Sequence, residues 1–189
     1  IARCKAIGNQ KDEFEKLEAA LQSYLYNLET EFSVEKDYCK VRGEDNHFRY
    51  LPLKNVVIRA LDSDSLFEVL SRVLAARVSK VAFKLSFESD NDLYEFVKNS
   101  PELLGSKDRV VVESENDFAN TMHEYERVIY ADIDKVSDYI FKEATKSLTF
   151  IIRQKPMMEG RLELLNYFIE QAVSHSFHIY GNLGELAIR

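Results

Sequence analysis

The protein has 189 residues, 46% of them hydrophobic and 30% charged, a composition typical of one globular domain with a sizeable core. Its formal net charge of −7 argues against a nucleic-acid-binding surface. Phosphate binding needs clustered Lys and Arg, which here are scattered among more numerous acids. No apolar run approaches the roughly 20 residues that cross a bilayer, and the N-terminus lacks a signal-peptide core. We therefore expect a cytoplasmic protein without a transmembrane segment.

The two cysteines, Cys4 and Cys39, are too few for a disulfide framework and lack the spacing of a zinc site. We expect both to be reduced thiols. The first residue is Ile1 rather than Met. A piece cut from a longer polypeptide would show this, as would processing or a trimmed start.

Apolar side chains recur at steps of three and four between Asn9 and Glu35, which predicts one long amphipathic helix. The stripe consists of Phe14, Leu17, Leu21, Leu25, Leu28 and Phe32. Asn9 is the expected N-cap. We assign residues 1–40 to a helical arm and expect its stripe to pack on the chain's own domain, with a neighbouring domain as the alternative partner.

From residue 41 onwards, short apolar strands alternate with helices. A segment at 47–53 contains Pro52 and is therefore expected at a sheet edge, and Ser65-x-x-Glu68 has the spacing of a capping box that opens a helix. The pattern predicts strands at 56–58, 81–87, 110–112, 128–130 and 149–152, separated by helices of 8 to 14 residues. Such alternation indicates the α/β class, with a mostly parallel sheet covered on both faces. We therefore predict a Rossmann-like, three-layer αβα domain over residues 41–189.

The closing segment begins with a helix-like apolar run at 162–169 and passes through an alternating stretch to a Gly-Asn-Leu-Gly sequence at 181–184. The two glycines permit positive φ and close approach of the backbone to another surface. We interpret residues 171–189 as a docking tail. Its candidate docking residues are Phe177, His178, Tyr180, Gly181, Asn182, Leu183 and Gly184.

A Rossmann-like sheet binds its ligand at the carboxyl ends of its strands, and the sequence offers no catalytic set there. No strand is followed by GxGxxG, GxxxxGK[ST] or GxSxG, and the chain has only six glycines. Neither cysteine follows a strand with a histidine base nearby. His175-x-x-His178 lacks a third ligand, which argues against a zinc site. We therefore predict no catalytic, cofactor-binding or metal-binding residue in this chain.

Acidic residues nonetheless follow two of the predicted strands, in a superficial likeness to a phosphoacceptor receiver domain. Asp62 and Asp64 follow the first core strand, Asp132 and Asp134 follow the fourth, and Lys155 follows the fifth. A receiver places its acceptor aspartate on the third strand, which here ends in Glu-Ser. Because Asp directly after a strand is also a common helix N-cap, we favour the capping interpretation.

Two segments carry a more specific likeness. Gly43-Glu44-Asp45-Asn46-His47-Phe48-Arg49-Tyr50-Leu51-Pro52-Leu53 is similar to a Gly-Glu-x-Asn segment that runs into a Leu-Pro strand. Residues 160–185 are similar to a closing segment with a Leu-Leu helix, an Ile-Glu-x-x-Ser-like stretch and a Gly-Asn tail. Together they resemble the C-terminal region of proline utilization A, the bifunctional bacterial proline dehydrogenase and 1-pyrroline-5-carboxylate dehydrogenase. The chain departs from that family's pattern at Asp45, where a basic residue is usual, and at 177–180.

The resemblance implies an aldehyde-dehydrogenase-like domain that has lost its active site and packs beside the true dehydrogenase. The tail would act as a lid over the tunnel that carries pyrroline-carboxylate, or glutamate semialdehyde, between two active sites. The resemblance implies that this chain binds no cofactor and that the parent enzyme binds NAD and FAD. Its partners would be the remaining dehydrogenase and proline dehydrogenase domains of the same polypeptide. The resemblance does not decide whether the protein forms a homo-oligomer. It also leaves two locations for the parent enzyme, free in the cytoplasm or peripheral to the inner membrane.

Two other hypotheses remain at this point. An independent small-molecule-binding α/β domain would have a well-formed apolar pocket at the strand ends. A receiver-like signalling domain would have its acidic residues arranged as described above.

Overall fold

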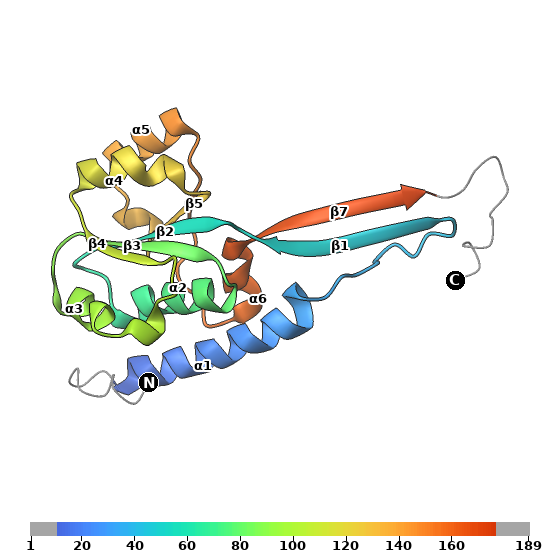
Figure 1. Ribbon diagram of the computed structural model, residues 1–189, viewed down its shortest axis with the longest axis horizontal. Coiled ribbons are helices and arrows are strands. Elements are labelled where there is room, and N and C mark those ends of the chain that lie inside the picture. Colours follow the sequence, from blue (N-terminus) through green and yellow to red (C-terminus); the bar gives the residue numbers. More distant parts are fainter. Residues whose placement is uncertain (1–10, 177–189) are drawn as a thin grey trace.

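The computed structural model describes residues 11–176. An α/β body contains a five-stranded parallel sheet with helices on both faces, and a long two-stranded antiparallel ribbon projects from it (Figure 1). The predicted Rossmann-like three-layer architecture with an N-terminal amphipathic helix is therefore confirmed. None of the helices within this part of the chain is long and apolar enough to span a membrane.

The sheet has the spatial order β4-β3-β2-β5-β6, and each neighbouring pair is parallel. Its strands are β2 (Asn55–Ala60), β3 (Ala82–Phe87), β4 (Arg109–Val112), β5 (Arg127–Ile129) and β6 (Ile151–Ile152). The helices between them are α2 (Leu66–Val78), α3 (Asp92–Lys98), α4 (Glu115–Thr121) and α5 (Asp138–Ser147). Short 3₁₀ turns accompany them at η3 (Pro101–Leu103), η4 (Met122–Glu124) and η5 (Ile133–Lys135). All five predicted core strands are present, with ends shifted by one or two residues.

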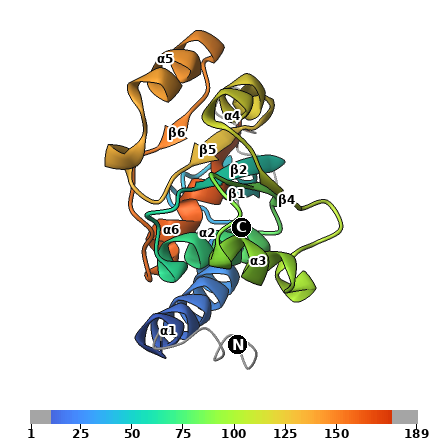
Figure 2. The same ribbon diagram turned by 90° about the vertical axis from the view of Figure 1, so that its left-hand side faces the viewer.

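Two hydrophobic clusters lie on opposite faces of this sheet. On β2, Val56 and Ile58 belong to the cluster that α1, α2 and α3 cover, whereas Val57 belongs to the cluster under α4 and α5. This division follows from the strand geometry, because successive side chains point to opposite faces. Figure 2 shows α4 and α5 on one side of the sheet and α1, α2 and α3 on the other.

Helix α1 (Lys11–Asn27) continues into one π-helical turn, η2 (Leu28–Phe32). Leu17, Tyr24 and Phe32 are buried in the same cluster as the sheet, which is the packing expected of a helix that lies on its own domain. Leu25 was predicted in the buried stripe but is 51% exposed. At 100° per residue it lies about 80° round the helix from Leu17, at the edge of the stripe. The predicted cap Asn9 lies outside the described residues, and the division at residues 40 and 41 stays a prediction.

The ribbon pairs β1 (Glu44–Pro52) with β7 (Phe168–Ser176) in an antiparallel register that runs from Glu44 opposite Ser176 to Pro52 opposite Phe168. The Pro52 strand lies at a sheet edge, as expected, because within the described residues its sheet consists of β1 and β7. The expectation for the closing segment was wrong in part. The helix-like run at 162–169 is one turn of α6 (Gly160–Glu163), one 3₁₀ turn η6 (Leu164–Tyr167) and then strand.

Candidate functional site

The order of the strands locates the place where a Rossmann-like sheet would bind a ligand. The chain moves outward from β2 through β3 to β4, then returns to the other side of β2 with β5 and β6. The crevice at the carboxyl ends of β2 and β5 is therefore the topological switch point, where dinucleotides bind in this class of fold. A receiver domain has the strand order 2-1-3-4-5. The five strands of this sheet, numbered along the chain from β2, have the order 3-2-1-4-5, so the topology is not that of a receiver.

The turn after β2 is held by its own side chains. Asp64 accepts a hydrogen bond from the Leu61 amide at 2.9 Å, and Ser65 caps α2 by accepting from the Glu68 amide. The Glu68 carboxylate returns to the Ser65 amide at 2.8 Å, which completes the predicted capping box. The N-terminus of α2, which would have to bind a pyrophosphate, thus already carries two carboxylates.

Two lysines form three ion pairs at this edge of the sheet. Lys135 follows β5 and places its Nζ 2.6 Å from Asp64 Oδ1 and 3.4 Å from Glu68 Oε2, so it joins the two sides of the switch point. Lys155 follows β6, and its Nζ lies 2.6 Å from Asp132 Oδ2. The hydrogen bond from Lys155 lowers the pKa of the Asp132 carboxyl below its usual value. The predicted N-cap role of Asp132 is present as well, because its side chain accepts from the Asp134 amide.

A buried arginine at the same edge was not anticipated from the sequence. Arg59 is 3% exposed and donates to Ser86 Oγ, to the Phe87 carbonyl and to the Glu113 carbonyl. Its guanidinium also lies over the Phe118 ring, 5.1 Å from the centroid. The signal was a cation inside the apolar run Val-Val-Ile-Arg-Ala-Leu, since such a side chain must find acceptors when the strand is buried. Arg59 binds the carbonyls at the ends of β3 and β4 rather than leaving them open to a ligand.

The described residues contain no group of three or more His, Cys, Asp or Glu arranged to hold a metal ion. His175 lies on β7 and is exposed, whereas His178 lies outside residues 11–176. Cys39 is an exposed free thiol in the segment before β1, away from the strand ends. Cys4 also lies outside the described residues.

The ribbon brings together the two segments on which the family resemblance rests. Residues 44–52 pair with residues 168–176, so the Gly-Glu-x-Asn segment lies beside the strand that leads into the tail (Figure 1). The predicted docking residues Phe177, His178, Tyr180, Gly181, Asn182, Leu183 and Gly184 all lie outside the described residues. Their role stays a prediction, but the strand that precedes them is fixed in register by β1.

No protein-family model matches the chain, and no curated protein matches it in sequence. Among solved structures, proline utilization A from Corynebacterium freiburgense is similar over 88% of this chain, with a TM-score of 0.59 and 23% identity. Betaine aldehyde dehydrogenase from Staphylococcus aureus in complex with NAD⁺ is similar over 76%, with a TM-score of 0.62 and 10% identity. An NAD⁺ complex of aldehyde dehydrogenase from Bacillus cereus is similar over 73%, with a TM-score of 0.56 and 13% identity.

The chain spans only 14% of the proline utilization A chain and 30% of each of the two aldehyde dehydrogenase chains. These likenesses show an aldehyde-dehydrogenase-like fold.

Proposed function

We propose that this chain is a non-catalytic, aldehyde-dehydrogenase-like module of a larger bacterial oxidoreductase that converts proline to glutamate. In that enzyme it would cover the substrate tunnel and support assembly. The observation that carries the proposal is the switch-point crevice. There, ion pairs within the chain occupy the position where a dinucleotide binds in this class of fold. Its NAD and FAD chemistry would belong to the remaining domains of the same cytoplasmic polypeptide.

The electrostatics of the crevice support the non-catalytic role. A dinucleotide pyrophosphate needs free backbone amides and positive potential at the first helix N-terminus. Here Asp64 and Glu68 stand at that end of α2, and Lys135 is already paired with both. An incoming phosphate would therefore meet two carboxylates whose counter-charge is in use.

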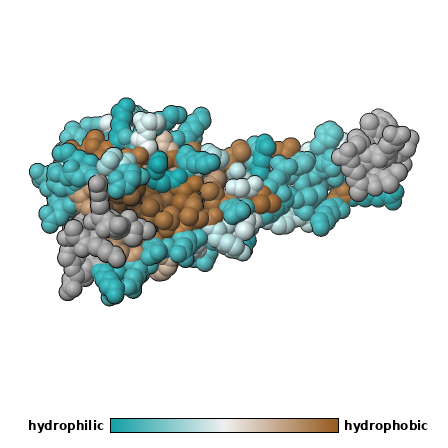
Figure 3. Space-filling model, turned by 60° about the horizontal axis from the view of Figure 1, so that its bottom comes forward, coloured by the Kyte–Doolittle hydropathy of each residue, from teal (hydrophilic) through white to brown (hydrophobic). Residues whose placement is uncertain are grey.

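The outer surface supports a place within a larger assembly. Figure 3 shows apolar residues gathered on the face of the body that carries α1. Apolar side chains of α1, α2 and α3 that remain partly exposed include Phe14, Leu21, Phe67, Leu74, Leu93 and Phe96. A contiguous apolar area of this kind typically marks an interaction surface.

The ribbon supports the role of the tail. It extends from the body and ends at Ser176, directly before the proposed lid residues 177–184 (Figure 1). The β1–β7 ladder would hold the start of the tail at a fixed distance from the body, so that the tail reaches a neighbouring domain. A lid at the end of a projecting arm can close a tunnel that the body itself does not touch.

Titration of NAD into the isolated chain tests the non-catalytic role. We expect no binding tighter than about 1 mM, a standard free energy of about −4 kcal/mol. An intact NAD-dependent aldehyde dehydrogenase serves as the positive control in the same cell. Binding of NAD in the micromolar range would contradict the proposal, and a changed affinity in an Asp64→Lys variant would then locate the site in the crevice.

The channelling role is tested in the full-length polypeptide. Gly181→Val with Gly184→Val blocks close backbone approach through the added Cβ branches. We expect a longer lag before NADH appears from proline, while proline dehydrogenase activity with an artificial acceptor stays normal in the same preparation. Unchanged coupled turnover would overturn the lid assignment without touching the prediction about NAD.

A further inference from the structure

Two adjoining hollows open at the amino edge of the sheet, opposite the crevice just described. One has a volume of about 300 Å³ and is lined by the first residues of β2, β3 and β4, Asn55, Ala82 and Arg109. The other has a volume of about 400 Å³ and lies between the end of α2 and the turn before β4. Both are lined by Ala82 and Lys107, so they share a wall. Their size is that of a small-molecule site.

The charge around these hollows is opposite in sign to that of the whole chain. The chain carries a net charge of −7, yet five cationic side chains and only two carboxylates line the hollows. The cations are Arg77, Lys80, Lys84, Lys107 and Arg109, and the carboxylates are Asp108 and Glu124. Clustered cations on an acidic protein create a local positive potential that attracts anions.

One of the two lining carboxylates is already in use, whereas Glu124 forms no ion pair within residues 11–176. The Asp108 carboxylate is 4% exposed, accepts from the amides of Phe83 and Gly105, and lies 3.6 Å from Arg77. Lys84 pairs with Glu113 at 2.8 Å. By contrast, Lys80, Lys107 and Arg109 form no ion pair with any of residues 11–176.

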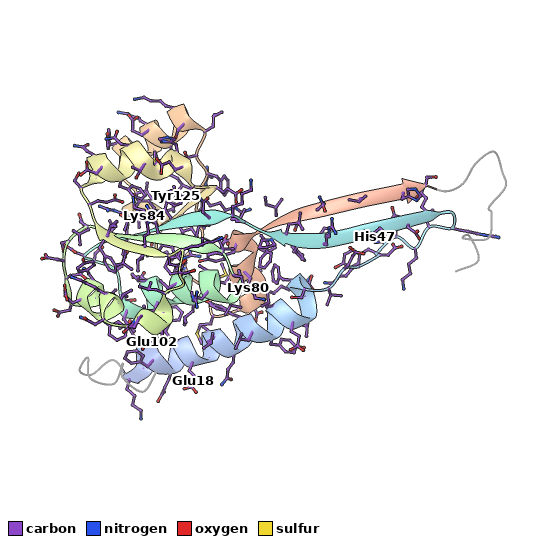
Figure 4. All side chains as sticks on the ribbon, viewed as in Figure 1. Glu18, His47, Lys80, Lys84, Glu102 and Tyr125 are labelled. Carbon is purple, nitrogen blue, oxygen red and sulfur yellow. The ribbon has the colours of Figure 1, made fainter. Side chains whose placement is uncertain are left out.

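Side-chain contacts hold the floor of the first hollow in place. The Lys84 side chain is only 10% exposed, and its ammonium donates to Thr121 Oγ1 at 3.1 Å and lies 5.9 Å from the centre of the Tyr125 ring. Figure 4 shows Lys84 and Tyr125 together over the sheet, and Lys80 beyond the end of α2. Glu113 neutralises this ammonium, so Lys84 shapes the floor of the hollow, and the net positive charge comes from the exposed cations around it.

The wall of the second hollow depends on a glycine. A Cβ on Gly105 would lie 2.5 Å from Arg77 Nη1, so glycine at this position lets the guanidinium lie over the turn at 105–108 without moving aside. Lys80 stands at φ 58, a left-handed position after a helix that glycine would adopt without strain. The chain thus carries a lysine at the mouth of the hollow where the backbone favours glycine.

We propose that these joined hollows bind a small multivalent oxyanion, such as the diphosphate group of a metabolite or a tricarboxylate. Lys107 lines both hollows, Arg109 the first and Lys80 the second. The joined space therefore carries three cations that form no ion pair within residues 11–176, which suits a ligand with two or more negative charges better than a single carboxylate. The site lies at the root of the ribbon, because Asn55 follows Pro52, the last residue of β1, by three positions. It is independent of the proposed non-catalytic role.

Calorimetric titration of the 189-residue chain with pyrophosphate, and separately with citrate, tests this site at about 20 mM and about 150 mM salt. The variant is Lys107→Gln with Arg109→Gln, two exposed positions. Its matched control is Lys142→Gln with Lys146→Gln on α5, which removes the same charge elsewhere. We expect a saturable site for at least one anion, tenfold or more weaker in the variant, within twofold of the parent in the control, and weaker at higher salt.

Lys80→Gly provides a second test that does not depend on the stability of the fold. It removes a cation while it relieves the left-handed strain, so the variant should fold at least as well and bind the anion more weakly. Pyrophosphate binding alone would indicate a phosphate-selective site, and equal binding of citrate a site that recognises charge only. No saturable binding, an equal loss in both double variants, or binding of polyglutamate but of neither small anion would overturn the proposal.

Discussion

The body and the ribbon are both built of β-strands, but different forces hold them together. In the body, β2 and β3 are buried at five of six positions each. In the ribbon, exposed and half-buried positions alternate along β1, and on β7 only Phe168 is buried. Burial of apolar surface therefore stabilises the sheet, whereas the ribbon depends on its hydrogen-bond ladder and on the end that is anchored to the body. The comparison shows that one chain can combine a core held by apolar burial with a projecting arm held by backbone hydrogen bonds.

The anchor of the ribbon is concentrated at its base. Arg127 donates to the carbonyls of Leu165 and Phe168 at 2.8 and 2.9 Å, and the Leu53 amide donates to the Tyr167 carbonyl. Burial lowers the pKa of Arg127. The Phe168 ring stacks on Phe32, with centroids 4.7 Å apart. Beyond this base, the segment that follows η2 supports β1, because Lys36 and Phe48 exchange two backbone hydrogen bonds and His47 Nδ1 lies 2.6 Å from Glu35 Oε1. The stability of the ribbon should decrease past these contacts, towards residues 44 and 176.

The largest effect should come from a buried ion pair that fixes α6 to α2. Arg72 and Glu163 are 1% and 0% exposed and 2.5 Å apart, and the Tyr167 hydroxyl donates to the Arg72 carbonyl. Arg72→Met leaves an unpaired buried carboxylate and should cost about 3–5 kcal/mol of unfolding free energy in urea titrations. The double variant Arg72→Met with Glu163→Met should recover most of that loss. A single variant within 1 kcal/mol of the parent would show that the pair is not buried in solution.

The next effect separates the two sides of α1. Leu17 is 5% exposed, so Leu17→Ala should cost about 2–5 kcal/mol and lower the melting temperature. Leu25→Ala, on the same helix but 51% exposed, is the matched control and should stay within about 0.5 kcal/mol. If both variants melt like the parent, α1 does not pack on the body, and the stripe belongs to an interface with another domain.

A smaller loss is expected where α1 and α6 touch. A Cβ on Gly160 would lie 2.5 Å from the Ser23 carbonyl oxygen, and the Gly160 amide donates to Ser23 Oγ at 2.9 Å. Because the obstructing atom belongs to the backbone, Gly160→Ala should cost about 1–3 kcal/mol. Gly105→Ala is an informative comparison, since its Cβ would meet the flexible end of Arg77 instead. A smaller loss at Gly105 than at Gly160 is the expected result in thermal melts.

Substitutions on the open face of the ribbon should matter still less. Ile169 and Val173 are 48% and 45% exposed, so Ile169→Thr and Val173→Thr should change stability by no more than about 0.5 kcal/mol. Amide hydrogen exchange sharpens the point, because protection should decrease from Phe168 towards Ser176. Uniform protection along β7 would contradict an arm that is anchored at its base.

The smallest effect concerns the Asp132–Lys155 pair at the carboxyl edge. The pKa of Asp132 is lowered in the folded chain. Its stabilising contribution is therefore present above the unfolded value of about 3.9 and is lost as the pH falls from there through the folded pKa. Lys155→Gln should raise the Asp132 pKa measured by NMR titration, with Lys142→Gln as the control. An unchanged midpoint would show that the pair is open in solution.

Local chemistry made the body predictable from the sequence. The run Val-Val-Ile at 56–58 identified a buried strand, and Ser65 with Glu68 gave the start of α2 to within one residue. Pairing over long distances carried no such signal, because any exposed alternating strand could be the partner of β1. The segment at 162–169 was ambiguous for the same reason, since short apolar runs suit helix and strand alike.

The candidate site was predicted less completely than the fold. The sequence correctly identified the capping role of Ser65. It did not indicate that Lys135 would reach Asp64 from another strand, since these residues lie 71 positions apart. Nor did it indicate the burial of Arg59 and Arg72, because a lone arginine in an apolar stretch has no visible partner until the fold supplies one.

The distance along the chain between Arg72 and Glu163 also bears on how the protein is made. The two residues are 91 positions apart. Tyr24 likewise donates a hydrogen bond to the carbonyl of Met157, a residue that is synthesised much later. At roughly 5–20 residues per second, α2 is exposed for about 5–20 s before its guanidinium can meet its carboxylate. During that interval Arg72 of α2 has no partner carboxylate, and the apolar faces of α1 and α2 are exposed to solvent. Nascent chains of this protein should therefore engage a holding chaperone until α6 has emerged from the ribosome.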